Sequence, residues 1–126
     1  MTGFRLASFQ AATGPRAGLI VEDRLYDVAA ITGRPEHASV LSLLDRWRLS
    51  EPMLRDVAQA PGREQGIALD NAVLLPPILF PPAVYCAGAN YADHVAAMER
   101  RLGLQPGPDP RADGGRPFHF LKASRC

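Results

Sequence analysis

Four prolines close together most constrain how this chain folds. They interrupt the longest apolar stretch, residues 72–86, at positions 76, 77, 81 and 82. Proline fixes φ, lacks a backbone N–H and disfavours helical conformation in the residue before it. The stretch is therefore neither one helix nor one central strand, and it is shorter than the ~20 residues of a membrane span. We expect a crossing between two units, with domains at 1–78 and 79–126.

The N-terminal residues predict a three-stranded β-meander. Residues 4–9 alternate imperfectly between two faces, and short β-type runs follow at 17–21 and 24–28. Thr13-Gly14-Pro15 and Glu22-Asp23 supply the turns between these runs. Three strands with short connections are about the smallest sheet that is stable with modest help.

The hydrophobic period then changes to that of a helix. A helix over 37–47 is predicted by four apolar residues at helical spacing: Val40, Leu41, Leu44 and Trp47. Ser50 is the expected N-cap of a second helix, because Glu51 and Pro52 suit its first turn. Residues 67–75 return to an extended pattern. The first unit is therefore expected to be α+β.

Charge and cysteine content exclude several classes of protein. The 14 basic and 13 acidic residues give a formal net charge of +1, so we expect no nucleic-acid partner. Two cysteines, Cys86 and Cys126, are too few for a disulfide framework. No N-terminal stretch resembles a signal peptide, and Arg5 interrupts the one early candidate. We expect a cytoplasmic protein with no membrane partner.

The second unit begins with a predicted buried strand at 83–87, in which Cys86 is expected to be a small core residue. Gly88-Ala89-Asn90 predicts a sharp exit, and a helix from Tyr91 to Leu102 follows. Residues 103–117 are rich in proline and glycine and predict a loop. A further strand begins at Phe118-His119-Phe120-Leu121.

His94 is the side chain of this unit best placed for chemistry. With Asn90 or Asp93 as the helix cap, His94 lies on the first turn, near the mouth of the loop. An imidazole there reaches both solvent and a ligand, as a general base near neutral pH requires. On local physics alone, such a histidine is more often a surface or capping residue.

The other polar candidates carry less chemistry. His37 is expected to be a surface or capping residue, and His119 is expected at a partly exposed or pocket-rim position. The three histidines lack metal-ligand spacing. Asp109 and Asp113 stand in the Pro/Gly loop, where ordering them around a cation is costly. The pair Arg100-Arg101 predicts a solvated helix face.

Two motifs resemble the entry signature of the fumarylacetoacetate hydrolase family. The segment Gly88-Ala89-Asn90-Tyr91-Ala92-Asp93-His94 fits G-x-N-Y-x-x-H, and Phe120-Leu121-Lys122 fits F-[LI]-K. The preceding residues resemble the family's small N-terminal domain, so the resemblance covers nearly the whole chain. It implies an α+β protein in which a small N-terminal meander with helices precedes the beginning of a β-rich catalytic domain.

The resemblance also implies a function. Members of the family are divalent-metal-dependent enzymes that act on β-diketo and related oxo acids, by C–C bond hydrolysis or by related decarboxylation or isomerisation. His94 matches the catalytic histidine, and Lys122 matches a pocket-edge lysine that suits a substrate carboxylate. Tyr91 matches a motif position beside the site, where substrate binding and packing both stay open. A small-molecule oxo acid and a homodimer are the implied partners.

Two departures from the family's pattern bear on activity. Many members carry H-x-x-E, but Ala97 stands at that position, and Glu99 lies about 140° around the helix from His94. The family's Mg²⁺ or Mn²⁺ ligands come from an E-x-E pair and a later aspartate, and this chain contains no E-x-E. Metal ligands are therefore expected only beyond Cys126, and no cofactor is expected for this chain alone.

Two alternative interpretations stay open. The strand that begins at Phe118 either belongs to a larger domain or pairs with residues 84–87 and completes a small one. The chain is then either a catalytically inactive fragment or remnant, or a small binding module unrelated to the family.

Overall fold

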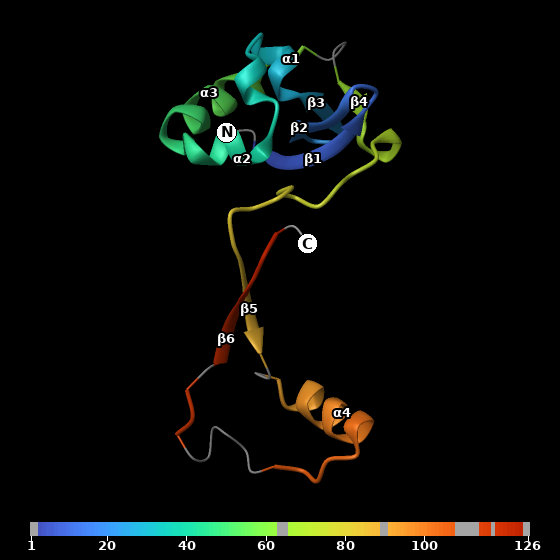
Figure 1. The fold of residues 1–126 in the computed structure, drawn as a ribbon. Coiled ribbons are helices and arrows are strands. Elements are labelled where there is room, and N and C mark those ends of the chain that lie inside the picture. The colour runs from blue at the N-terminus through green and yellow to red at the C-terminus, as the bar shows by residue number, and fades with distance from the viewer. Residues whose placement is uncertain (1–2, 63–65, 89–90, 108–113, 117, 125–126) are drawn as a thin grey trace. The chain divides into compact units, whose positions relative to one another are not determined.

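The computed structural model describes residues 3–62, 66–88, 91–107, 114–116 and 118–124. The chain is a mixed α+β protein, which confirms the predicted fold class. It divides into two units, 1–79 and 80–126, one residue from the division expected at the prolines (Figure 1). Within the described part of the chain, no helix is long and apolar enough to cross a membrane.

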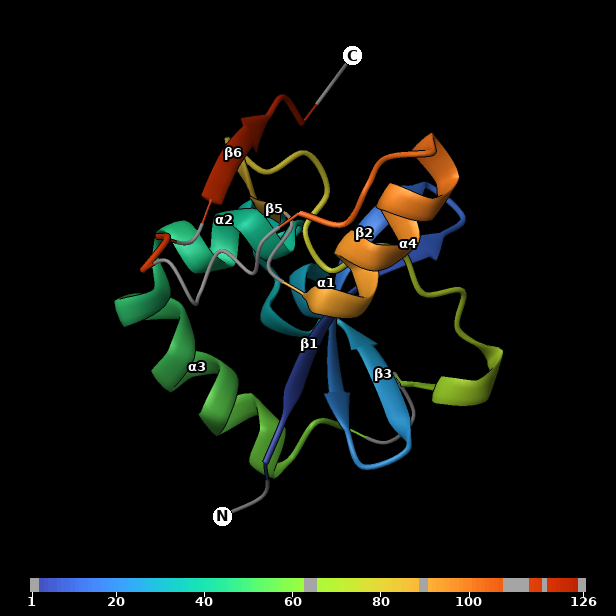
Figure 2. The ribbon, with the colours of Figure 1, turned by 90° about the horizontal axis from the view of Figure 1, so that it is seen from below.

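The first unit is built on an antiparallel four-stranded sheet in the order β1-β2-β3-β4. Its strands are β1 (Arg5–Ala11), β2 (Gly14–Val21), β3 (Arg24–Asp27) and β4 (Ile67–Ala68). Figure 2 shows β1, β2 and β3 lying side by side. The predicted meander is thus confirmed, and its second turn is at Glu22-Asp23 as expected. The first turn is at Ala12-Thr13, because Gly14 and Pro15 already belong to β2.

The central strand β2 is buried on both faces. Leu19 and Val21 face the helices and pack in a cluster with Leu43 and Leu54. Ile20, which lies between them in the strand, points to the opposite face and packs with Phe9 and Leu25. Alternate side chains of a strand point to opposite faces, so two-sided burial requires a covering layer on each side.

The first covering layer consists of helices, grouped to one side of the sheet in Figure 1. These are α1 (Val28–Thr32), the 3₁₀ turn η1 (Pro35–His37), α2 (Val40–Asp45) and α3 (Trp47–Gln59). The predicted first helix, 37–47, is thus confirmed in its centre and shorter than expected. The helix α1 was not predicted, because Val28 continues the apolar pattern of β3.

The second covering layer is the segment after β4. Leu69 and Ala72 pack against the cluster of Ile20 on the second face. The segment then runs beside β1, where Gln10 N–H donates to Val73 O at 2.9 Å and Leu75 N–H donates to Ser8 O at 2.8 Å. The extended stretch predicted at 67–75 is therefore a short strand, a 3₁₀ turn η3 (Leu69–Asn71) and a second pairing. It pairs with β3 at one edge of the sheet and with β1 at the other.

The prediction that Ser50 caps the second helix is wrong. The helix α3 already begins at Trp47, and Ser50 N–H donates to Arg46 O at 3.0 Å inside it. Pro52 lies within the helix, where it removes the hydrogen bond to the carbonyl of Arg48. Arg48 is an exposed residue, and a helix carbonyl on the solvent side can bond to water instead.

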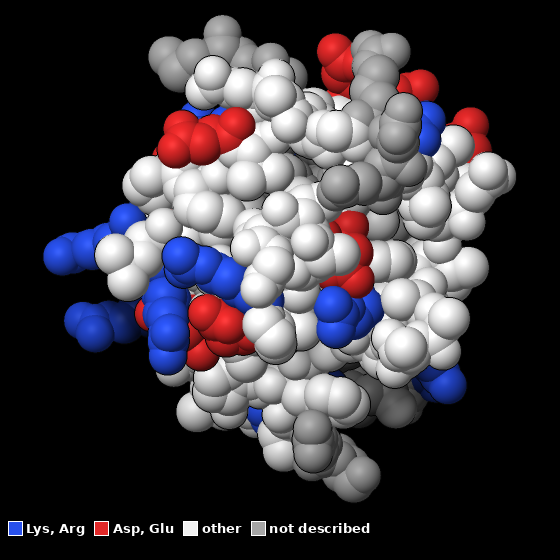
Figure 3. Space-filling model, turned by 90° about the horizontal axis from the view of Figure 1, so that it is seen from above, with Lys and Arg blue, Asp and Glu red and all other residues white. Residues whose placement is uncertain are grey.

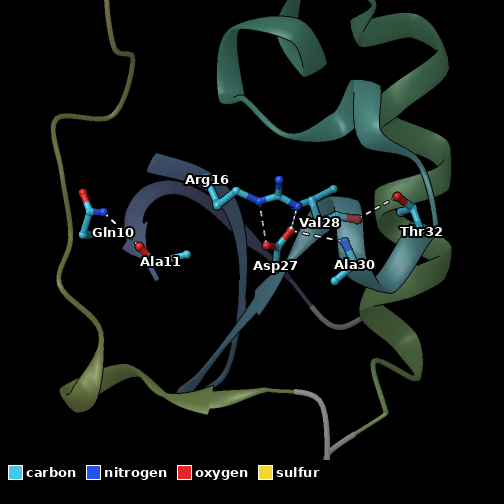
Figure 4. Close-up of polar contacts among 7 residues, drawn as sticks. All are labelled: Gln10, Ala11, Arg16, Asp27, Val28, Ala30 and Thr32. Atoms are coloured by element: carbon cyan, nitrogen blue, oxygen red, sulfur yellow. Dashed lines mark hydrogen bonds and ion pairs between the residues drawn. The ribbon is translucent and has the colours of Figure 1, made fainter. Parts of the chain in front are cut away.

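Asp27 joins the sheet to the helices (Figure 4). Its Oδ1 accepts a hydrogen bond from Ala30 N–H at 3.2 Å, which makes Asp27 the N-cap of α1. Its carboxylate also accepts two hydrogen bonds from Arg16 of β2, at 2.8 and 3.2 Å. The hydrogen bond to Asp27 raises the pKa of the Arg16 guanidinium; partial desolvation opposes this effect and coulombic attraction adds to it.

Two substitutions at Asp27 separate these roles. Asp27→Asn keeps a capping oxygen and weakens an ion pair whose side chains are about a quarter exposed, so we expect a loss below about 1 kcal/mol. Asp27→Ala also removes the cap and should cost about 1 kcal/mol more. Urea denaturation of both variants measures the difference. Glu51→Gln, which breaks the surface pair with Arg55, is the control and should cost about 0.5 kcal/mol or less. Equal losses for the Asn and Ala variants would show that the cap contributes nothing.

Candidate functional site

The second unit contains the motif residues on a two-stranded sheet and one helix. Strand β5 (Val84–Gly88) pairs antiparallel with β6 (Phe118–Lys122), with Gly88 opposite Phe118 and Val84 opposite Lys122. The helix α4 (Ala92–Leu102) follows β5 in sequence. The pairing of the last strand with residues 84–87, left open by the sequence, is therefore present.

The predicted burial of the strand at 83–87 is wrong. Tyr85 is 78% exposed and Cys86 is half-buried, so Cys86 is no core residue. Among the described residues of the second unit, none is buried. A two-stranded sheet has two faces to cover, and only a further layer of structure can bury them.

One face of this small sheet carries an aromatic pair. The rings of Phe118 and Phe120 are stacked with centroids 6.0 Å apart. The Phe118 ring lies against Gly88 on the neighbouring strand. A Cβ at Gly88 would lie 2.5 Å from this ring, so only glycine fits there without displacing the phenylalanine. Lys122 Nζ lies 5.5 Å from the centroid of Phe120, a cation–π distance. The lysine of the F-L-K motif thus lies over an apolar ring.

His94 lies in the first turn of α4, as expected, and its side chain is exposed. Tyr91 is the N-cap residue and makes no side-chain capping bond. Asp93 lies inside the helix, so it does not cap it as proposed; its Oδ1 accepts from His94 N–H at 2.8 Å. Asn90, the other expected cap, lies outside the described residues.

No hydrogen bond or ring contact joins the side chains of the three predicted site residues, His94, Tyr91 and Lys122, which are all described. Lys122 lies opposite Val84, four residues before the end of β5 from which the chain continues to α4. Four residues of strand span about 13 Å. Tyr91 is 72% exposed.

The Glu99 carboxylate bonds to the backbone after α4 and not to His94. Its Oε1 accepts from Gly107 N–H at 3.0 Å, and its carbonyl accepts from Leu104 N–H at 2.9 Å. Glu99 thus fixes the chain after α4, where Gly103 ends the helix with a φ of 66°. This contact, together with its position around the helix, leaves His94 without a carboxylate partner among the described residues. Arg100 and Arg101 are exposed, as a solvated helix face requires.

Within the described ranges, no three His, Cys, Asp or Glu side chains are grouped so that they could hold a metal ion. Asp109 and Asp113 lie outside those ranges. His119, on the face opposite the phenylalanines, is exposed and lies opposite Ala87.

A hollow in the first unit was missed by sequence reasoning. It lies between the segment of η1 and the start of α3, and its polar lining comes from Arg34, Glu36, His37, Arg46 and Ser50. His37 is half-buried and hydrogen-bonded through Nδ1 to Thr32 Oγ1 at 3.1 Å, so it is more than a surface residue. The sequence feature that could have indicated this hollow is the spacing Arg46-x-x-x-Ser50, which puts both residues on one side of a helix.

Comparison with known proteins adds no relative to these geometric findings. No protein-family model, no curated protein and no solved structure matches the chain.

The two sheets should differ in stability. Because no described side chain of the second unit is buried, the amide protons of β5 and β6 should exchange roughly 100-fold faster than those of β2. Hydrogen exchange followed by NMR on the whole chain measures both sets in one experiment. Protection of β6 equal to that of β2 would mean that the small sheet is covered in solution.

Proposed function

We propose that this chain is the N-terminal part of a divalent-metal-dependent enzyme of the fumarylacetoacetate hydrolase type, which acts on β-diketo or related oxo acids. The position of His94 carries the proposal. Its imidazole is exposed on the first turn of a helix that follows a strand ending in glycine. There it can meet both water and a substrate, as a general base must.

His94 would act on a water molecule. Its neutral imidazole takes a proton from water, and the resulting hydroxide adds to a carbonyl carbon of the β-diketo acid. The C–C bond to the carbon between the two carbonyl groups then breaks, and its electron pair passes into an enolate. The imidazolium returns its proton to that carbon, so the base is regenerated.

Lys122 and Tyr91 would hold the substrate. The Lys122 ammonium suits a carboxylate, and its place over Phe120 gives the site an apolar wall next to the charge. Tyr91 is exposed and can donate from its hydroxyl. The described residues do not fit the divalent ion that the family resemblance implies, because no carboxylate cluster is present among them. No step of the proposed reaction is therefore assigned to a metal.

The apolar surface of the second unit supports a larger catalytic domain. Exposed large apolar side chains come from both strands, from the N-cap residue and body of α4 and from the loop after it: Tyr85, Tyr91, Met98, Leu102, Leu104, Phe118, Phe120 and Leu121. An apolar surface of this kind usually marks an interface with further protein. We propose that further structure of the same domain, in a cytoplasmic homodimer, covers it.

The chemistry at His94 need not be hydrolysis. Ala97 cannot orient the imidazole, and Glu99 is bonded to Gly107. A histidine without a carboxylate partner is a weaker base for water, so decarboxylation or isomerisation of an oxo acid belongs to the same proposal.

The proposal is tested first on the gene. An in-frame extension past the codon for Cys126 that encodes E-x-E and a later aspartate would support it; a stop codon directly after Cys126 would favour an inactive fragment or a separate binding module. The complete product is then assayed with Mg²⁺ or Mn²⁺ on acylpyruvates and oxaloacetate.

The matched variants are His94→Asn and His119→Asn, since both histidines are exposed. His94→Asn should lower kcat about 100-fold or more, because general-base catalysis is lost. His119→Asn should leave kcat within about twofold of the parent. Equal activity of the two variants would refute the assignment of His94.

A further inference from the structure

Lys122 is the only lysine of this chain, and the other 13 of its 14 basic residues are arginine. The guanidinium of arginine is a planar fork with a built-in geometry, whereas the ammonium of lysine is a point charge on a flexible stem. The direction in which a lysine points therefore has to be fixed by its neighbours. For Lys122 to hold a substrate carboxylate, a residue of the second unit has to orient its side chain.

The residues next to Lys122 share one face of the small sheet. Alternate residues of a strand point to the same face, which groups three residues of β6: Phe118, Phe120 and Lys122. The β5 residues opposite them lie on that face too: Gly88, Cys86 and Val84. These three residues of β5 are half-buried, whereas the two residues between them are exposed. The two rings and the lysine stem therefore cover this face of β5.

A continuous row of contacts runs along this face from Lys122 to Gly88. Lys122 Nζ lies 5.5 Å from the centroid of the Phe120 ring, and this ring is stacked with Phe118 at 6.0 Å between centroids and 27° between planes. The Phe118 ring in turn lies against Gly88. Each ring restricts the next, so the position of the lysine is tied to the glycine at which the first motif begins.

The Phe120 ring orients the ammonium without occupying its donors. A ring face attracts a cation through its quadrupole, and this contact needs no N–H hydrogen bond. Lys122 forms no ion pair with a carboxylate of any described residue. The N–H donors of the ammonium are therefore available to the carboxylate of a ligand.

Arginines of the first unit are held in a different way. Arg16 donates to Asp27 at 2.8 Å, and Arg55 donates to Glu51 at 2.5 Å. On the face drawn in Figure 3, basic and acidic side chains are interspersed. A carboxylate partner fixes a cation, but it also offsets the charge and competes with an anionic ligand. A neutral ring avoids this competition, so it suits a cation that has to bind an anion.

We propose that Phe120 is a positioning residue, whose ring holds the Lys122 ammonium in place for a substrate carboxylate while Phe118 and Gly88 restrain the ring. The identity of the ligand rests on the function proposed above, whereas the ring contact itself involves this chain alone. Phe120 is assigned no contact with the reacting atoms. Its loss should therefore weaken substrate binding and leave the chemical step unchanged.

The ring contact is tested by NMR on the whole chain with ¹³C-labelled lysine, which gives one lysine signal because Lys122 is the only lysine. The ring current of Phe120 should shift the ε-CH₂ protons of Lys122 upfield from the position of a free lysine. Phe120→Leu should abolish this shift, and Phe120→Tyr should keep it. Phe118→Leu should reduce it, because the stacked ring no longer restrains Phe120.

Tyr85→Leu is the matched control. Tyr85 is an exposed aromatic residue of β5 on the opposite face of the same sheet, so its loss should leave the lysine signal unchanged. The Cα shifts of β5 and β6 show whether each variant retains the strand pairing. A parent signal at the free-lysine position, or an equal change in Tyr85→Leu and Phe120→Leu, would overturn the proposal.

The effect on binding is measured on the complete gene product, assayed with Mg²⁺ on acetylpyruvate. Phe120→Leu should raise KM roughly threefold and leave kcat within about twofold, since a cation–π contact at an exposed site contributes about that factor. Phe120→Tyr should restore KM. An unchanged KM, or a loss confined to kcat, would refute the positioning role. Absence of any turnover by the parent would refute the proposed function instead, and the lysine signal then decides the role of Phe120 by itself.

Discussion

Burial of β2 on both faces is the constraint on which the first unit depends. Leu19 and Val21 are covered by the helices, and Ile20 is covered by the segment that follows β4. Each large aliphatic side chain removed from water contributes about 1.5–3 kcal/mol, so leaving either face open would expose several such contributions. The chain therefore has to place helices on one side of the sheet and cross the other side before it reaches the prolines.

A chain of polar contacts links this sheet to the hollow. Arg16 of β2 holds Asp27, and Asp27 caps α1. The last residue of α1, Thr32, bonds to Val28 O and then accepts from His37 in the hollow. The orientation of His37 therefore depends on the helix that Asp27 caps.

The second unit, in contrast, has no buried core among its described residues. Its strands pair fully, but no described residue in it is buried, and its aromatic and aliphatic side chains face solvent. Backbone pairing alone gives a small sheet little stability, because a hairpin of two strands has no core. This contrast is why a larger domain is proposed around His94.

The sequence by itself determined the local structure: turn residues fixed the meander, the helical period located α2 and α4, and the prolines marked the division of the chain. It also supplied the positions of His94 and Lys122 within their elements. These features depend on φ preferences and on neighbours a few residues away, so they can be predicted without knowing the fold.

Tertiary structure alone decided burial and partnership. The apolar run at 84–87 has the composition of a core strand, yet its residues alternate between half-buried and exposed. Full burial depends on layers that distant segments provide. Ser50 has the properties of a cap, yet it lies inside α3 and lines the hollow. Glu99 bonds to Gly107, and His37 to Thr32, because the chain folds back on itself there. The chemistry of a side chain follows from its residue type, but its neighbours in space are set by the packing of the whole chain.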